Sequence, residues 1–174
     1  MNETRLYILC GLPFAGKTTL GKELVERLGF VYIDIDQINT DFGVGLCGAS
    51  ISPDEWVRTN AEAYKQLGDA LISGHSVLCE GASYTKELRD RLRAIAFERG
   101  VASRVIYVDI SESEARQCLY SNRTTQHRHD VPDDNFALVV TYFEPPAKEE
   151  QILYFRQSEC LEEWILQNFK TTNL

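Results

Sequence analysis

The order of strand-like and helix-like segments predicts an α/β protein with a five-stranded parallel sheet and helices on both of its faces. Short apolar runs rich in β-branched or aromatic residues alternate with segments that repeat apolar residues at helical spacing. Such βα units build parallel sheets. Ligands of these sheets bind beyond the carboxyl ends of the strands, so the residues at those ends are the candidates for function.

Each expected element has a local signal. In the first helix, Leu20, Leu24, Val25 and Leu28 recur at helical spacing, and Gly29 follows, where a helix commonly ends. The fourth strand is followed by a serine at position 111 that is suited to cap the next helix. The strands are expected at residues 5–10, 30–35, 77–79, 104–110 and 152–155, and the later helices near residues 53–71, 88–96, 112–123, 136–143 and 161–169.

Composition and charge limit the possible functions. A chain of 174 residues with 44% hydrophobic residues fits one compact domain, expected to span residues 1–174, and excludes wholesale disorder. The 18 basic and 26 acidic residues give a net charge of −8, which disfavours a long nucleic acid as a partner. No apolar run suits a membrane span or a signal peptide. The five cysteines are odd in number and form no CxxC pair, as is typical of a reduced, cytoplasmic protein.

The segment Gly11–Thr18 (GLPFAGKT) matches the pattern GxxxxGK[ST] between the first strand and the first helix. Its glycines let successive N–H groups point at phosphate oxygens, and the helix N-terminus adds positive charge. Lys17 is expected at the β- and γ-phosphates and the Thr18 hydroxyl at Mg²⁺. An ordinary tight turn would explain neither residue. The expected nucleotide-binding residues are Gly11, Pro13, Phe14, Ala15, Gly16, Lys17, Thr18 and Thr19.

Acidic residues follow the second and third strands. Asp36 is expected one strand period beyond Asp34, just past the strand end, where it can accept a proton from an attacking hydroxyl. Alternatively, Asp34 or Asp36 caps the short helix that follows. Glu80 ends the third strand, where it can hold Mg²⁺ through water or be a solvated acid.

The polar segment of residues 116–133 is expected to be a mobile lid. Arg116 and Arg123 are seven residues apart, so both can project from one helix face toward the site. Arginines in such a segment can neutralise charge on a transferring phosphoryl group. A solvated surface loop is the alternative.

The region of residues 36–60 is expected to form the substrate side of the site. Its Gly43, Gly45 and Gly48 allow a flexible wall. Trp56 and Phe42 can stack on a ring of the substrate or simply pack against the core.

Two further sets of polar residues have a simple structural interpretation. His127 and His129 have no cysteine nearby and no recognised ligand spacing, so no zinc site is expected. Arg89, Arg91 and Arg93 alternate with apolar positions and are expected to form the solvated face of their helix.

Together, several of these segments resemble the small P-loop kinases. The group includes the polynucleotide 5′-kinase domain, chloramphenicol phosphotransferase and zeta-toxin-like kinases. The resemblance extends over roughly the whole chain, but only the phosphate loop is specific by itself. It rests on Gly11–Thr18, Asp36, Val77–Glu80, Asn122–Arg123 and Phe143–Pro146.

The resemblance implies a three-layer P-loop NTPase fold of the nucleoside-kinase type with a small lid. It also implies phosphorylation of a hydroxyl group with ATP and Mg²⁺. By position, Lys17 and Thr18 would hold ATP and Mg²⁺, and Asp36 would be the general base. Arg123, with Arg116 or Arg128, would contact phosphates from the lid. The family usually has Asp where this chain has Glu80, so Glu80 is expected either to hold Mg²⁺ or to face the substrate.

We therefore predict an ATP-dependent kinase that acts on a small-molecule hydroxyl acceptor by direct in-line transfer. The alternatives are a P-loop nucleotide hydrolase and a non-catalytic nucleotide-binding module. A GTPase is disfavoured because NKxD, and DxxG after the third strand, are absent from the sequence. The predicted catalytic residues are Lys17, Asp36, Arg123 and Arg128; Arg116 and Arg123 are also assigned to the nucleotide, and Thr18 and Glu80 to the metal.

Overall fold

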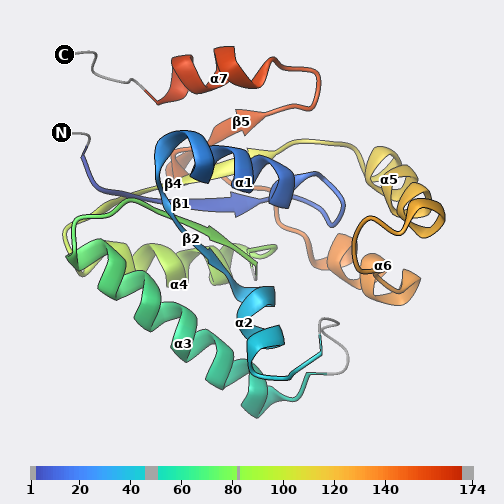
Figure 1. Ribbon diagram of the computed structural model, residues 1–174, viewed down its shortest axis with the longest axis horizontal. Coiled ribbons are helices and arrows are strands. Elements are labelled where there is room, and N and C mark those ends of the chain that lie inside the picture. Colours follow the sequence, from blue (N-terminus) through green and yellow to red (C-terminus); the bar gives the residue numbers. More distant parts are fainter. Residues whose placement is uncertain (1–2, 46–50, 82, 170–174) are drawn as a thin grey trace.

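The computed structural model describes residues 3–45, 51–81 and 83–169, and these residues form one five-stranded sheet (Figure 1). All neighbouring strands are parallel, and their order is β2-β3-β1-β4-β5. The α/β architecture predicted from the sequence is confirmed. The strands are β1 (Arg5–Cys10), β2 (Val31–Asp34), β3 (Val77–Glu80), β4 (Ala102–Val108) and β5 (Leu153–Phe155).

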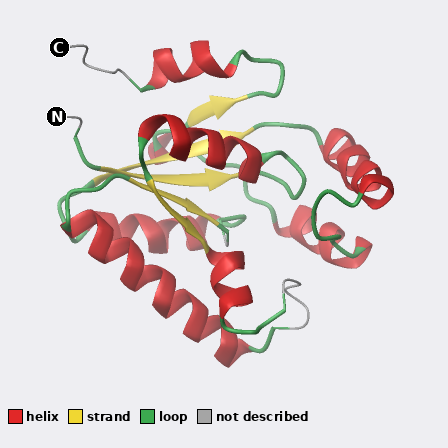
Figure 2. Cartoon of the chain, viewed as in Figure 1, coloured by secondary structure: helices red, strands yellow, loops and turns green. Residues whose placement is uncertain are grey.

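Helices cover both faces of this sheet and make three layers (Figure 2). Side chains of β1 alternate between the two cores: Leu6 and Ile8 pack toward α3 and α4, whereas Tyr7 and Leu9 pack toward α1 and α7. Among the described residues, no helix combines the length and apolar character that a membrane crossing requires. The helices are α1 (Lys17–Leu28), α2 (Ile35–Asp41), α3 (Pro53–Ile72), α4 (Lys86–Phe97), α5 (Glu112–Thr125), α6 (Asp133–Tyr142), the 3₁₀ helix η2 (Lys148–Glu150) and α7 (Leu161–Asn168).

Helices α5 and α6 lie beyond the carboxyl ends of the strands, beside the loop that follows β1 (Figure 1). A third apolar cluster holds them there: Leu12 and Phe14 of the loop pack with Ala115 and Leu119 of α5 and Phe136 of α6. The segment expected to be a lid is therefore anchored on the phosphate loop through buried apolar side chains.

The second strand is shorter than predicted. It ends at Asp34, whose carboxylate accepts hydrogen bonds from the N–H groups of Asp36 at 3.0 Å and Gln37 at 3.3 Å and so caps α2. The expected placement of Asp36 one strand period beyond Asp34 is wrong, because the helix has already begun. The predicted cap at Ser111 is confirmed, since its hydroxyl accepts a hydrogen bond from the N–H of Glu114.

Arg89 is not solvated as predicted but is 0% exposed. Its guanidinium forms a two-point ion pair with Glu150, with N–O distances of 2.6 and 3.1 Å. It also donates to the backbone carbonyls of Ser83 and Glu144, each at 2.9 Å. Helical periodicity cannot reveal a partner 61 residues away. The pair ties α4 to the segment between α6 and β5.

Replacing Arg89 by Met is expected to destabilise the protein by about 3–5 kcal/mol, because Glu150 would then be a buried charge without its partner. The matched variant Arg91→Met removes an exposed pair with Glu87 on the same helix and should destabilise the protein far less, because exposed ion pairs add little to stability. Urea unfolding measures both. Equal, small effects would contradict the structural role given to Arg89.

Candidate active site

The loop between β1 and α1 has a backbone shape that requires glycine at two positions. A Cβ atom on Gly11 would lie only 2.7 Å from the carbonyl oxygen of Val108. Gly16 has a φ of 94°, in the left-handed region, and it caps α1 without a side-chain hydrogen bond. The first N–H groups of α1 thus have no side-chain cap, which is the arrangement that binds phosphate at a helix N-terminus.

Lys17 stands at the start of α1, with its ammonium group folded over the loop. Its Nζ atom donates to the carbonyl oxygens of Gly11 at 2.9 Å and Leu12 at 2.8 Å. Burial is the main cause that lowers the pKa of Lys17 below its ordinary value, and the nearby Glu80 opposes that effect. A phosphate at the loop would therefore meet a cation that is already positioned.

Glu80 joins three elements at the floor of the site. The Thr18 hydroxyl donates to its Oε1 atom at 2.8 Å, and the Tyr32 hydroxyl donates to its Oε2 atom. Glu80 is only 7% exposed. Burial and the Glu80 carboxylate raise the pKa of Tyr32, so this hydroxyl stays protonated. The oxygen donors of Thr18 and Glu80 are of the kind that Mg²⁺ prefers, so these residues fit that ion.

Asp36 lies in the first turn of α2 and lines the same cleft as Lys17 and Glu80. Desolvation, followed by the neighbouring carboxylates of Asp34 and Glu80, raises the pKa of Asp36 to about 6. Solvent still reaches this side chain. Asp36 is therefore a stronger base than an ordinary aspartate and remains mostly ionised at neutral pH.

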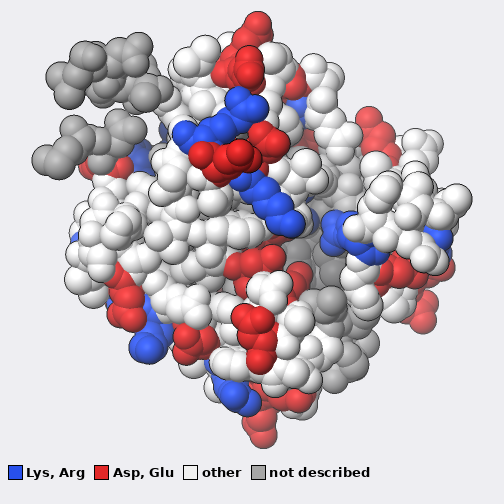
Figure 3. Space-filling model, viewed as in Figure 1, with Lys and Arg blue, Asp and Glu red and all other residues white. Residues whose placement is uncertain are grey.

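These groups open into a cleft of about 660 Å³. Basic and acidic side chains gather around the hollow between α5–α6 and the rest of the molecule (Figure 3). Its walls come from the phosphate loop, the ends of β2 and β3, and helices α2, α3, α4 and α6. The lining residues are Gly11, Pro13, Phe14, Lys17, Thr18, Asp34, Asp36, Trp56, Asn60, Glu80, Gly81, Ser83, Tyr84, Leu88, Arg128, Val131, Asn135, Leu138 and Val139.

Of the predicted lid arginines, Arg128 lines the cleft. Its guanidinium lies 4.5 Å from the centre of the Phe14 ring on the phosphate loop. The side chain of Asn122 holds the backbone of Arg128 from both sides, donating to its carbonyl and accepting from its N–H, each at 3.0 Å. In the sequence, only the resemblance of Asn122–Arg123 to the small P-loop kinases draws attention to Asn122. No local pattern predicts that it holds the backbone of Arg128.

Arg116 and Arg123, on α5, do not line the cleft and have other partners. Arg116 pairs with Glu112 at 2.5 Å. Arg123 pairs with Asp130 and Asp133, each at 3.1 Å, and so braces the connection between α5 and α6. Their assignment to the nucleotide stays a prediction.

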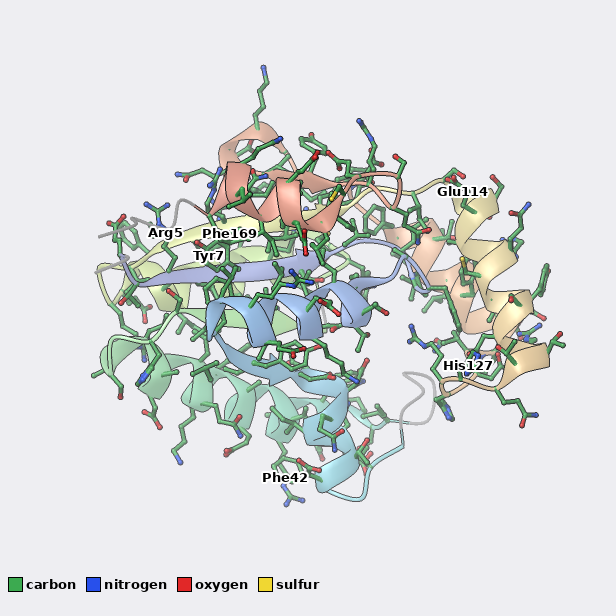
Figure 4. The ribbon with its side chains drawn as sticks, turned by 45° about the horizontal axis from the view of Figure 1, so that its top comes forward. Arg5, Tyr7, Phe42, Glu114, His127 and Phe169 are labelled. Carbon is green, nitrogen blue, oxygen red and sulfur yellow. The ribbon has the colours of Figure 1, made fainter. Side chains whose placement is uncertain are left out.

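Of the remaining predicted residues, some line the cleft and others do not. Trp56 lines the cleft, whereas Phe42 lies at the end of α2 beneath the guanidinium of Arg58, 4.0 Å from the ring centre (Figure 4). Ala15, Gly16 and Thr19 do not line the cleft. Cys47 and Gly48, which entered the predictions for the cysteines and the flexible wall, lie outside the described residues.

The fold and the phosphate loop define a P-loop nucleotide-binding protein. Residues 6–146 match the AAA_33 family, described as an AAA domain, and the chain belongs to this family.

The chain is also similar to curated and structurally characterised kinases. A shikimate kinase from Thermobifida fusca is 30% identical over 120 residues, which cover 66% of this chain and 63% of that protein. A probable gluconokinase from Schizosaccharomyces pombe is 24% identical over 152 residues, 84% of this chain and 76% of that protein. A sugar kinase from Janibacter shares the fold, with a TM-score of 0.66 at 13% identity, over 94% of this chain and 91% of that one. The chain thus shares the fold of a solved sugar kinase, and its match to the shikimate kinase spans less than two thirds of that protein's length.

The raised pKa of Asp36 has a consequence for stability. The folded state binds the Asp36 proton more tightly than the unfolded state, so the carboxylate destabilises the fold increasingly as the pH rises from about 4 to about 6. Asp36→Asn should therefore stabilise the protein at pH 7.5 by about 1 kcal/mol after allowance for solvent screening, or about 2–4 °C in Tm.

Thermal unfolding at several pH values measures this gain, which should shrink toward zero as the pH approaches 4. The exposed Asp69, on α3, gives the control variant Asp69→Asn, for which no such gain is expected. A lower Tm for Asp36→Asn at pH 7.5 would contradict the electrostatic interpretation.

Proposed function

We propose that this protein is an ATP-dependent kinase that transfers the γ-phosphoryl group of ATP to a hydroxyl group of a small-molecule acceptor. One observation carries the proposal: the phosphate loop, with Lys17 and Thr18, shares a cleft with an aspartate whose pKa is about 6. Similarity to shikimate kinase and gluconokinase supports the same class of reaction.

The loop and α1 would hold the nucleotide by its phosphates. Backbone N–H groups, the helix N-terminus and the Lys17 ammonium provide positive charge around the β- and γ-phosphates. Thr18 and Glu80 would hold Mg²⁺, which when bound neutralises phosphate charge. Tyr32 fixes the second oxygen of Glu80 and so orients this carboxylate toward Thr18.

Asp36 would act as the general base. The acceptor hydroxyl oxygen forms a bond to the γ-phosphorus while the bond from that phosphorus to the bridging oxygen of ADP breaks. The hydroxyl proton passes to the Asp36 carboxylate. The raised pKa of Asp36 makes this transfer more favourable than it would be to an ordinary aspartate.

The α5–α6 segment would cover the site and add a positive charge to it. Arg128 already lies in the cleft, where it can neutralise charge on the transferring group. We propose residues 116–133 as the lid and residues 36–60 as the substrate side, within one domain of residues 1–174. For Arg116 and Arg123 to reach phosphates, α5 must move and Arg123 must release Asp130 and Asp133.

Lys17→Ala should reduce acceptor-dependent ADP release by at least about 100-fold, because it removes the cation at the transferring phosphate. The exposed Lys65 on α3 gives the control variant Lys65→Ala, which should retain full activity. Nucleotide binding by calorimetry and ADP release by a coupled assay measure the effect. Activity of Lys17→Ala near that of the wild type would contradict the assignment.

Asp36→Asn should bind ATP with an affinity close to that of the wild type but lose about 10²–10⁴-fold in phosphoryl transfer, because the proton acceptor is gone. Asp69→Asn serves as the charge-matched control. Full transfer by Asp36→Asn would remove this residue from catalysis. Brisk ATP hydrolysis that no acceptor accelerates would favour the hydrolase alternative.

A further inference from the structure

The cleft extends beyond the phosphate loop to a wall on the Asp36 side. Trp56 and Asn60, one turn apart on α3, line it. Helix α3 is tied to α2 by a buried hydrogen bond of 2.5 Å from the Thr59 hydroxyl to Oδ1 of Asn39. Asp36 belongs to α2, so the proposed base and this wall lie on the same side of the cleft. An acceptor bound next to the base would therefore contact the wall.

This acceptor wall is largely apolar. Tyr84, just before α4, Leu88, in its first turn, and Leu138 and Val139, on α6, line the cleft with Trp56. Leu138 is 51% exposed, so its apolar surface is not used in packing within the described structure. Such a wall suits a ligand with an apolar or aromatic face.

The cationic side chains that line the cleft contact the phosphate loop. Among the described lining residues, only Lys17 and Arg128 are positively charged, against three carboxylates. Lys17 donates to loop carbonyls, and Arg128 stacks on Phe14 of the same loop. The sequence of residues 46–50 (LCGAS) and Ala82 adds no charged residue. A carboxylate on the acceptor would therefore lie near Asp36 with no cation on the wall to balance it.

Asn60 adds a requirement for a hydrogen-bond donor. Its Oδ1 atom is buried and has no hydrogen-bond partner among the described residues, although its side chain lines the cleft. A buried acceptor atom without a partner is costly, and a ligand O–H or N–H would satisfy it. A hydroxyl group of the acceptor, besides the one that is phosphorylated, can supply this proton.

We propose that the acceptor is an uncharged hydroxyl compound with an apolar or aromatic face, and not a carboxylic acid. This inference rests on the proposed kinase function. The proposed acceptor differs from the compounds named in the two relatives, shikimate kinase and gluconokinase, because shikimate and gluconate both carry carboxylates.

The test compares pairs of related acceptors that differ chiefly in charge or in apolar surface. Acceptor-dependent ADP release is measured for shikimate against its methyl ester, gluconate against glucitol, and glucose against phenyl glucoside. The uncharged member of each charge pair should have a kcat/KM at least about tenfold higher, and the phenyl compound should exceed glucose.

Three variants locate the effect on the acceptor wall. Asn135→Lys places a cation in the cleft and should shift the preference toward the acids by about tenfold. Ala137→Lys adds the same charge at an exposed position of α6 that does not line the cleft and should leave the preference unchanged. Asn60→Leu should raise the KM for the acceptor while the KM for ATP stays the same.

The failures of the two proposals are distinguishable. Acceptor-dependent ADP release with equal or better use of the acids would overturn the uncharged acceptor and leave the kinase function standing. A preference for a positively charged acceptor over its uncharged counterpart would overturn it as well. ADP release that no member of the panel accelerates would contradict the kinase function and, with it, this inference.

Discussion

The candidate site depends on the carboxylate of Glu80, buried at the end of β3. One oxygen accepts the hydroxyl of Thr18 at the start of α1, and the other accepts the hydroxyl of Tyr32 from β2. Through these two hydrogen bonds the phosphate loop is fixed relative to the strand that leads into α2 and Asp36. The Glu80 carboxylate also contributes, after desolvation and the Asp34 carboxylate, to the raised pKa of Asp36.

Much of the fold follows from sequence patterns that act over short distances. Short apolar runs locate the strands, the Ser111 cap marks a helix start, and the phosphate loop combines a local motif with strand and helix context. Asp36 was predicted from a strand register that the structure does not have, yet it reaches the cleft because Asp34 starts α2 at that point. The predicted strand placement of Asp36 was therefore wrong, and its role as the base stays a prediction.

The rest of the site depends on contacts between distant parts of the chain. Tyr32 and Glu80 are 48 residues apart, and Arg89 and Glu150 are 61 residues apart. In a single sequence, Tyr32 is only an aromatic residue in a strand and Arg89 only a charged residue in a helix. Nothing in the sequence indicates their partners. The same reason explains why the sequence did not separate Arg128, which lines the cleft, from Arg123, which pairs with Asp130.

The central claim is that Asp36 accepts the acceptor's proton in an ATP-dependent transfer, and the pH dependence of the reaction tests it most directly. If the claim is right, kcat/KM for acceptor-dependent ADP release should rise tenfold per pH unit at low pH and level off near pH 6, the value set by the raised pKa of Asp36. A flat profile between pH 5 and 8 would contradict it.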